Sequence, residues 1–341
     1  MLLSRGRGLC LALLWALSEA YPGNGKDLCV LFCYDTRNKT EEGFHIGLID
    51  FFSQKITTVL DLPLTLTGAG GGVAAGADDG QFFIPNADIA YNYVLEVSLL
   101  ENTTTDRLVA PPAPFTGIPA FYAMNLNAAT DDLVVIFEES TRISWVAAAT
   151  VLPSQGTSTA LTPNFAAQWL NDFNWRKVGV SAVDSKRGLL YFVAGAKSND
   201  AATLVGIPMG APRAPVVFHT LASIPGTDID DLAYSAPLDE FVGAAFNLST
   251  GMSSIWRTPA GGVGGKEWVQ VYTWPVGKES SMELGNGVLS KDGYTFFAAF
   301  TNAMGRPSYF AFDLRANKLL SSFVVPANEY EGMLTAEVLA C

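Results

Sequence analysis

Residues 284–326 read LGNGVLSKDGYTFFAAFTNAMGRPSYFAFDLRANKLLSSFVVP. Four apolar or alternating runs in this stretch are separated by short segments rich in Gly, Asn, Asp, Ser and Lys. Apolar runs of this length between turn residues are typical of β-strands joined by tight turns. The stretch therefore predicts a small antiparallel sheet of four strands.

The same pattern recurs along the chain. Residues 176–221 and 230–274 repeat it clearly, and residues 72–111 and 121–162 repeat it with less regular strands. The period is about 50 residues, which indicates a repeat architecture in which each unit needs its neighbours to bury its apolar faces. Only residues 164–174 suggest a helix.

The two ends of the chain together supply one more unit. Residues 332–340, GMLTAEVLA, resemble a first strand with nothing after it, and residues 27–34, DLCVLFCY, resemble a second strand with nothing before it. The runs FHIGLIDF and ITTVLDLP would be its third and fourth strands. Radial stacking of six such sheets buries both faces of each one. We therefore expect an all-β, six-bladed β-propeller whose closing blade is shared between the N- and C-termini. A two-sheet sandwich is the alternative, but it would not explain a unit split between the ends.

The first twenty residues resemble a secretory signal peptide. Arg5 and Arg7 precede an apolar run over residues 9–17, and Ser18-Glu19-Ala20 follows, with small residues where signal peptidase requires them. A membrane anchor is the alternative, but the run is much shorter than the roughly 20 residues that span a bilayer. We expect a signal peptide over residues 1–20, a single propeller domain over residues 21–341, and a secreted, extracellular protein.

Three N-glycosylation triplets agree with secretion. They begin at Asn38, Asn102 and Asn247, and each lies near a predicted turn. The sequence predicts a secreted glycoprotein, with the alternative that none of the three is used.

The charge balance narrows the choice of partners. The chain has 21 Lys and Arg against 33 Asp and Glu, and loss of residues 1–20 changes its net charge from −12 to −13. It has no run of basic residues, so neither nucleic acid nor membrane insertion is expected. Cations or basic partners fit this charge better, although it also serves simple solubility.

The cysteines bear on ring closure. Cys10 leaves with the signal peptide, and Cys29, Cys33 and Cys341 remain in an oxidising compartment. Cys29 and Cys33 are four residues apart on one predicted strand, roughly 13 Å by strand rise. This is too far for a disulfide, which needs Cα atoms within about 7 Å. We expect a Cys29–Cys341 disulfide that locks the ring, with Cys33–Cys341 pairing or three reduced thiols as the alternatives.

The expected inter-blade connections are rich in side-chain oxygen. In a propeller, the connections from one blade's outer strand to the next blade's inner strand open onto one mouth of the central channel. Acidic and amide residues occur here at 172–174, 228–231, 283–286 and 328–331. Such ligands suit Ca²⁺ or another hard cation, and a bound cation could activate water. The alternative is that they are ordinary solvated turns.

The repeats resemble the broad six-bladed propeller superfamily across the mature chain. Within it, the senescence-marker/gluconolactonase family and its lactonase relatives hold a divalent metal at the channel mouth with Glu, Asn and Asp. The resemblance implies Glu283, Asn174 and Asp230 as metal ligands, with Glu331 as a further carboxylate.

Aromatic residues also lie near the predicted mouth. Trp175, Trp274 and Tyr330 could stack on sugars or anchor a protein partner. The alternative is that they pack between blades.

A Ser-His-Asp hydrolase is disfavoured. The chain has two histidines, His45 in a predicted strand of the closing blade and His219 in a predicted outer strand, and no G-x-S-x-G motif.

The sequence favours recognition as the function. We expect a monomeric secreted ring that binds a ligand, glycan or extracellular protein at the mouth that bears the inter-blade connections. An extracellular metal-dependent hydrolase or lactonase is the alternative, and a structural matrix component is a third. The fold by itself does not choose among them, because propellers host unrelated functions.

Overall fold

A computed structural model describes the greater part of the expected strands. It covers residues 28–34, 44–50, 54–62, 73–76, 80–87, 92–109, 120–127, 132–139, 142–148, 160–161, 168–169, 173–175, 180–196, 202–209, 217–220, 229–247, 249–261, 268–275, 281–282, 285–290, 292–301, 306–324 and 333–340. The expected signal peptide lies outside the described residues. No helix in the described part of the chain has the length and apolarity needed to cross a bilayer.

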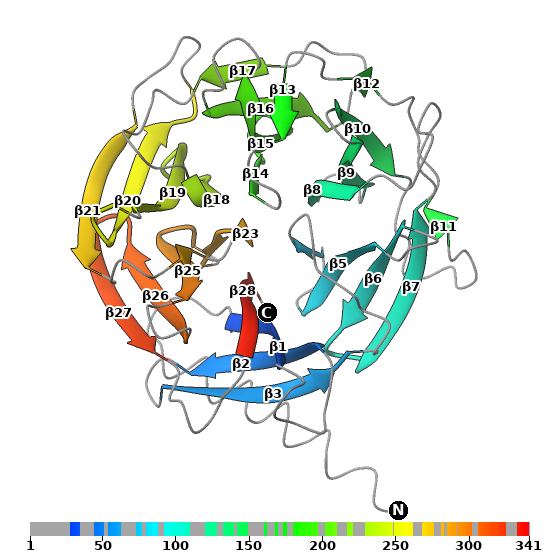
Figure 1. The fold of residues 1–341 in the computed structure, drawn as a ribbon, viewed down its shortest axis with the longest axis horizontal. Coiled ribbons are helices and arrows are strands. Elements are labelled where there is room, and N and C mark those ends of the chain that lie inside the picture. The colour runs from blue at the N-terminus through cyan, green and yellow to red at the C-terminus, as the bar shows by residue number, and fades with distance from the viewer. Residues whose placement is uncertain are drawn as a thin grey trace, which may run out of the picture.

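The described strands form six separate small sheets, which we number in chain order (Figure 1). Sheet 1 has the order β28–β1–β2–β3 and combines the two ends of the chain. Its strands are β28 (Met333–Ala340), β1 (Leu28–Tyr34), β2 (Phe44–Asp50) and β3 (Lys55–Asp61). The expectation of a shared closing sheet is therefore confirmed, almost to the residue.

Sheets 2 and 3 come from the less regular repeats. Sheet 2 contains β4 (Ala74–Ala75), β5 (Gln81–Ala87), β6 (Asn92–Ser98), β7 (Thr103–Val109) and β11 (Ala160–Leu161). Sheet 3 contains β8 (Ala120–Asn127), β9 (Asp132–Glu139), β10 (Arg142–Ala148) and β12 (Gln168–Trp169).

Sheets 4, 5 and 6 come from the three clear repeats. Sheet 4 contains β13 (Phe173–Trp175), β14 (Ser181–Asp184), β15 (Leu189–Ala196), β16 (Ala202–Pro208) and β17 (Val217–Thr220). Sheet 5 contains β18 (Ile229–Ser235), β19 (Glu240–Asn247), β20 (Met252–Pro259), β21 (Val269–Pro275) and β23 (Gly285–Asn286). Sheet 6 contains β22 (Ser281–Met282), β24 (Val288–Leu289), β25 (Thr295–Thr301), β26 (Pro307–Asp313) and β27 (Lys318–Val324).

The sheets stand around a common centre (Figure 1). In Figure 1, β14, β18 and β28 lie toward that centre. The inner strands of the six sheets contact one another in the order β4, β8, β14, β18, β24, β28. All pairings between consecutive strands within a repeat are antiparallel. As a result, the turns between strands alternate between the two faces of the ring.

Two expectations about residues 121–174 were wrong. The suggested helix is absent from its described part, because residues 168–169 and 173–174 are in strands. The fourth strand of sheet 3 is β12, which lies beyond the end of the expected repeat at residue 162. Residues 160–161 instead form β11, which pairs in parallel with the outer strand β7 of sheet 2. β11 therefore covers part of the outer edge of sheet 2, and a covered edge strand is protected from pairing with other chains.

Both faces of the sheets are buried, which explains why the middle strands are apolar without a break. In β9, Leu133, Val135 and Phe137 pack with sheet 2, whereas Val134 and Ile136 pack with sheet 4. Successive side chains of a strand point to opposite faces, so a continuous apolar run matches a sheet that has a neighbour on each side. Radial stacking accounts for this arrangement, and a two-sheet sandwich does not.

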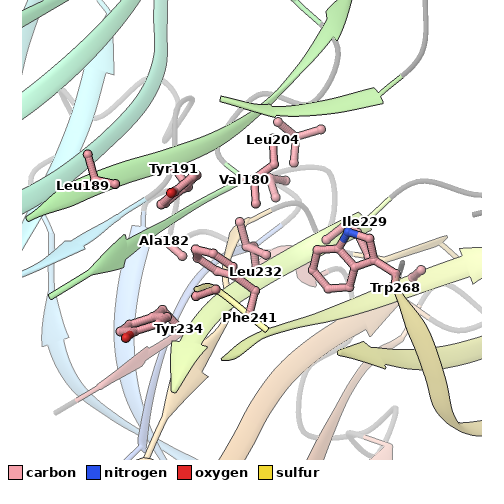
Figure 2. Close-up of a cluster of buried hydrophobic side chains, with 13 residues drawn as sticks. Val180, Ala182, Leu189, Tyr191, Leu204, Ile229, Leu232, Tyr234, Phe241 and Trp268 are labelled. Atoms are coloured by element: carbon pink, nitrogen blue, oxygen red, sulfur yellow. The ribbon is translucent and has the colours of Figure 1, made fainter. Parts of the chain in front are cut away.

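The interface between sheets 4 and 5 is typical of this packing (Figure 2). The Tyr191 and Phe241 rings meet edge to face with centroids 4.8 Å apart. Gly206 lies opposite Tyr191 in the register, and a Cβ at Gly206 would come within 2.6 Å of the Tyr191 ring. Glycine at this position therefore makes room for the Tyr191 ring.

Candidate functional site

Three inner strands each have a β-bulge near their first residue. In β8, β18 and β28 one residue near the start has no register partner, namely Tyr122, Asp230 and Leu334. Such β-bulges bend the strand and re-aim the side chain of the extra residue. The bulges place these three residues at the ends of the strands that the inter-blade connections enter.

Asp230 is part of the protein's internal hydrogen bonding. The residue is 6% exposed, and its Oδ2 accepts a hydrogen bond from the Phe246 backbone N–H at 3.2 Å. Phe246 lies on the neighbouring strand β19, so the Asp230 carboxylate stabilises the backbone where the bulge interrupts the strand pairing. The sequence placed this residue at the boundary between a connection and the repeat that begins at residue 230, and it lies within β18.

Tyr122 links two sheets from its bulge. Its hydroxyl donates to the carbonyl oxygen of Val193 in sheet 4 at 2.6 Å, and the side chain is fully buried. Its ring meets Phe192 edge to face at 5.7 Å.

A charged cluster joins sheets 4 and 5 on the opposite face of the ring. Arg187 lies in the β14–β15 turn, and its Nη1 donates to Asp184 Oδ2 at 2.7 Å and to Asp239 Oδ1 at 2.9 Å. Its Nη2 donates to Asp239 Oδ2 at 2.9 Å, so Asp239 in the β18–β19 turn receives a bidentate pair. The Tyr234 hydroxyl completes the cluster by donating to Asp239 Oδ1 at 2.7 Å.

The cluster shifts the titration of its members. Hydrogen bonds from Arg187 and then Tyr234 hold the pKa of Asp239 well below its usual range. Hydrogen bonds to Asp239 and Asp184 raise the pKa of Arg187 further above its already high value. Burial, followed by the hydrogen bond to Asp239, raises the pKa of Tyr234. Burial, followed by the charge of Asp184, raises the pKa of Tyr191 to about 12. Arg187 and Asp239 therefore form an ion pair at neutral pH.

A second arginine joins sheets 5 and 6. Arg257 donates to Glu240 within sheet 5, to the Leu314 carbonyl oxygen at 2.7 Å, and to Asn317 Oδ1 at 2.7 Å. Nearby, the Ser235 hydroxyl donates to the Gly293 carbonyl oxygen at 2.8 Å. None of these contacts between sheets was predicted from the sequence. For the contact between Arg187 and Asp239 the sequence did carry a signal, because the turns at residues 184–188 and 237–240 have complementary charges at equivalent places in adjacent repeats.

The expected metal ligands can be placed only in part. Asp230 lies in β18, and Asn174 lies in β13 opposite Gly195 of β15. Glu283 and Glu331 lie outside the described residues. Among the residues that are described, no three His, Cys, Asp or Glu side chains gather as metal ligands.

The expected aromatic contacts are also only partly placed. Trp274 lies in the outer strand β21 and packs edge to face on Phe310 of sheet 6, with ring centroids 5.0 Å apart. It therefore takes part in packing between sheets, as one interpretation of the sequence held. Trp175 lies in β13, and Tyr330 lies outside the described residues.

Both histidines lie in the expected strands, His45 in β2 and His219 in β17. His45 is buried, and its Nδ1 lies 2.7 Å from Oδ1 of Asp61 on the neighbouring strand β3.

The closing sheet fixes the register around the cysteines. Cys29 lies opposite Leu339 and Cys33 opposite Thr335, while Cys341 itself lies outside the described residues. The partner of Cys29 is thus two residues before Cys341 in the sequence, and the partner of Cys33 is six residues before it.

Solved structures share this architecture. TolB from Acinetobacter baumannii matches with a TM-score of 0.57 and 11% identity, over 98% of this chain and 72% of that one. A chain of a nidogen/laminin complex matches with a TM-score of 0.53 and 13% identity, over 91% of this chain and 98% of that one. The periplasmic gluconolactonase of Pseudomonas aeruginosa matches with a TM-score of 0.52 and 14% identity, over 87% of this chain and 83% of that one.

The chain has the β-propeller fold. At these identities the likeness establishes the fold alone. No protein-family model matches the chain, and no curated protein matches it in sequence.

Proposed function

We propose that the chain is a secreted, six-bladed recognition propeller that binds a glycan or an extracellular protein at its loop face. The loop face is the face of the ring that bears the connections from each outer strand to the next inner strand. These connections are the part of a propeller in which sequence can vary without disturbing the packed sheets, so specificity resides there.

The count of six blades rests on the six sheets and on the chain ends. Each sheet corresponds to one repeat, and sheet 1 combines β28 with β1, β2 and β3. Contacts between neighbouring inner strands run from β4 to β28, and Ile46 of sheet 1 lies in one apolar cluster with Phe82 of sheet 2, which supports a closed ring.

Secretion is supported by the first twenty residues and by three glycosylation triplets. The solved gluconolactonase with the same fold is described as periplasmic, so this fold serves at least one protein outside the cytoplasm.

The observation that favours recognition over metal chemistry is the hydrogen bonding of Asp230. Its buried carboxylate accepts the Phe246 N–H and supports a bulge, which is a structural task. A protein partner is favoured further by the nidogen chain, which was solved in a complex with laminin and matches nearly end to end.

Binding of the secreted protein to a glycan array and to purified laminin tests this proposal. We expect saturable binding that Trp175→Ala and Tyr330→Ala weaken. Arg315→Ala is the matched control, because Arg315 is 62% exposed and lies in the β26–β27 turn on the opposite face. The assignment to the loop face would be contradicted if Arg315→Ala abolished binding while Trp175→Ala and Tyr330→Ala left it unchanged.

A metal-dependent lactonase is the second candidate, favoured by the shared fold of the solved gluconolactonase. Hydrolysis of glucono-1,5-lactone that requires Ca²⁺ and is lost in Glu283→Gln would replace the recognition proposal with this one. We expect no hydrolysis above the uncatalysed rate.

A further inference from the structure

The turn between β6 and β7 exposes an apolar side chain. Leu100 is 66% exposed, more than any other large hydrophobic residue in the described part of the chain. Its neighbours in the turn are polar or half-buried, and Ser98 Oγ accepts the Glu101 N–H at 3.3 Å. The turn is therefore ordered by its own hydrogen bonding, yet it presents leucine to water.

The same turn contains an acceptor asparagine. Asn102 is exposed and has a φ of 53°, a left-handed conformation that asparagine tolerates better than most residues. It begins the triplet Asn102-Thr103-Thr104 and is two residues from Leu100. A glycan attached there would start beside the exposed leucine.

We propose that Asn102 carries an N-linked glycan and that this glycan covers Leu100. The proposal rests on the secretion of the chain, because the glycan is added in the secretory pathway. An N-glycan is bulky and solubilising, so it removes an exposed apolar side chain from contact with other molecules.

The Asn247 triplet provides an internal comparison. In the turn between β19 and β20, Asn247 Oδ1 accepts the Ser249 N–H at 3.0 Å, the Ser249 hydroxyl at 2.6 Å and the Thr250 N–H at 3.2 Å. The exposed described residues of this turn, Ser249 and Thr250, are polar. A glycan at Asn247 would cover no comparable apolar group among them.

The two turns also lie on opposite faces of the ring. The β6–β7 turn joins the third and fourth strands of sheet 2, and the β19–β20 turn joins the second and third strands of sheet 5. Because strands alternate in direction from the centre outward, the Asn247 turn is on the loop face and the Asn102 turn is on the other. A glycan at Asn102 therefore leaves the proposed binding face open.

Site occupancy and solubility together test the proposal. The full chain is expressed in glycosylating cells, and each triplet is scored by mass spectrometry of peptides after enzymatic glycan removal in ¹⁸O-water. Size-exclusion chromatography then measures the aggregated fraction of wild type, Asn102→Gln, Asn102→Gln with Leu100→Ser, and Asn247→Gln as the matched control.

We expect Asn102 to be occupied and Asn102→Gln to raise the aggregated fraction several-fold, with Leu100→Ser restoring the wild-type profile and Asn247→Gln leaving it unchanged. A secreted protein with a glycan at Asn38 or Asn247 but none at Asn102 would overturn this inference alone. An occupied Asn102 whose removal leaves aggregation unchanged would overturn the covering role. A chain retained in the cytoplasm without any glycan would overturn the proposed secretion as well.

Discussion

The acidic side chains of this protein differ in what surrounds them. Asp184 is fully buried, and its carboxylate accepts the backbone N–H groups of Lys186 and Arg187 as well as the Arg187 guanidinium. Asp230 is buried with a backbone donor, and Asp239 is partly exposed in a bidentate pair. Each of these carboxylates is stabilised by donors from its own protein, so acidity in the sequence does not by itself indicate a metal site.

Substitution of Arg187 tests the cluster between sheets 4 and 5. Arg187→Met removes the partner of a buried carboxylate and an inter-sheet contact, so we expect the free energy of unfolding to fall by about 1–3 kcal/mol. Chemical denaturation measures this change. Arg315→Met is the control, because Arg315 is 62% exposed and its ion pair with Asp313 is long, at 3.9 Å. It also loses the contact of its guanidinium with the Tyr294 ring at 4.7 Å, so its effect should stay below about 1 kcal/mol.

The pH dependence of stability tests Asp239. Its pKa is depressed in the folded protein, whereas the pKa of an aspartate in an unfolded chain is about 3.9. As pH falls through that value the unfolded chain takes up the proton first, so this contribution to stability is present above it and is lost below it. We expect Asp239→Asn to flatten the acid side of a plot of stability against pH. Parallel curves for the two proteins would contradict the role given to this pair.

The types of these residues could be predicted from the sequence, but their contacts could not. The sequence placed Asp230 at the edge of a strand but did not mark the β-bulge there, because a bulge depends on how two strands pair. The contact between Arg187 and Asp239 spans 52 residues and depends on how two repeats stack. The pattern along one strand carries no information about the bulge, and the complementary charges of the turns at residues 184–188 and 237–240 indicate the Arg187–Asp239 contact only once the two repeats are known to stack.

At the scale of elements, the inner strand of sheet 6 is interrupted at Gly287. On one side β23 pairs in parallel with β18 of sheet 5, and on the other β24 pairs with β25. The Gly287 N–H donates to the Leu232 carbonyl oxygen at 2.7 Å, which links the two sheets at the centre of the ring.

The close approach of residue 287 to Leu232 requires glycine at this position, because a side chain would not fit. A Cβ there would collide with the Phe296 ring and lie 3.2 Å from the Leu232 carbonyl carbon. Phe296 is fully buried, so its ring cannot move aside easily. We expect Gly287→Ala to destabilise the protein by about 1–3 kcal/mol in thermal or chemical unfolding. Adding Phe296→Leu should recover part of the loss, and a Gly287→Ala protein as stable as wild type would contradict the close approach.

Elements with a clear repeat could be predicted from the sequence, and short ones could not. The expected strand at 332–340 is β28 (Met333–Ala340), because a long apolar run next to turn residues leaves little choice. β11 and β12 have two residues each, too few for a periodic pattern, so the end of the third repeat was misplaced. Their positions depend on sheets 2 and 3, which the strands join.

At the scale of the whole molecule, the ring depends on the pairing of its two ends. β1 lies between β28 and β2, so one sheet holds both ends of the described chain (Figure 1). The predicted Cys29–Cys341 disulfide would reinforce this pairing, although Cys29 lies opposite Leu339 and Cys341 follows two residues later. The bridge therefore requires the last residue to reach back toward Cys29.

The thiols of the secreted protein test this prediction. We expect Cys33 to be a buried, inert thiol, so alkylation of the denatured but unreduced protein should label Cys33 and spare Cys29 and Cys341. Cys29→Ser and Cys341→Ser should each lower the free energy of unfolding by about 2–5 kcal/mol, the usual contribution of a native disulfide. Cys33→Ser is the matched control on the same strand and should have a smaller effect. Labelling of Cys29 with protection of Cys33 would favour the other pairing.

Thermal unfolding of wild type, Asp230→Ala and Asp230→Asn, each in Ca²⁺ and in chelator, tests the central claim that this ring is a recognition scaffold with a structural Asp230. We expect Asp230→Ala to lower Tm equally in both conditions, Asp230→Asn to lower it less because an acceptor oxygen remains, and Ca²⁺ to leave wild type unchanged. A wild-type Tm that rises with Ca²⁺ and loses this response in both variants would contradict the account and assign Asp230 to a metal site.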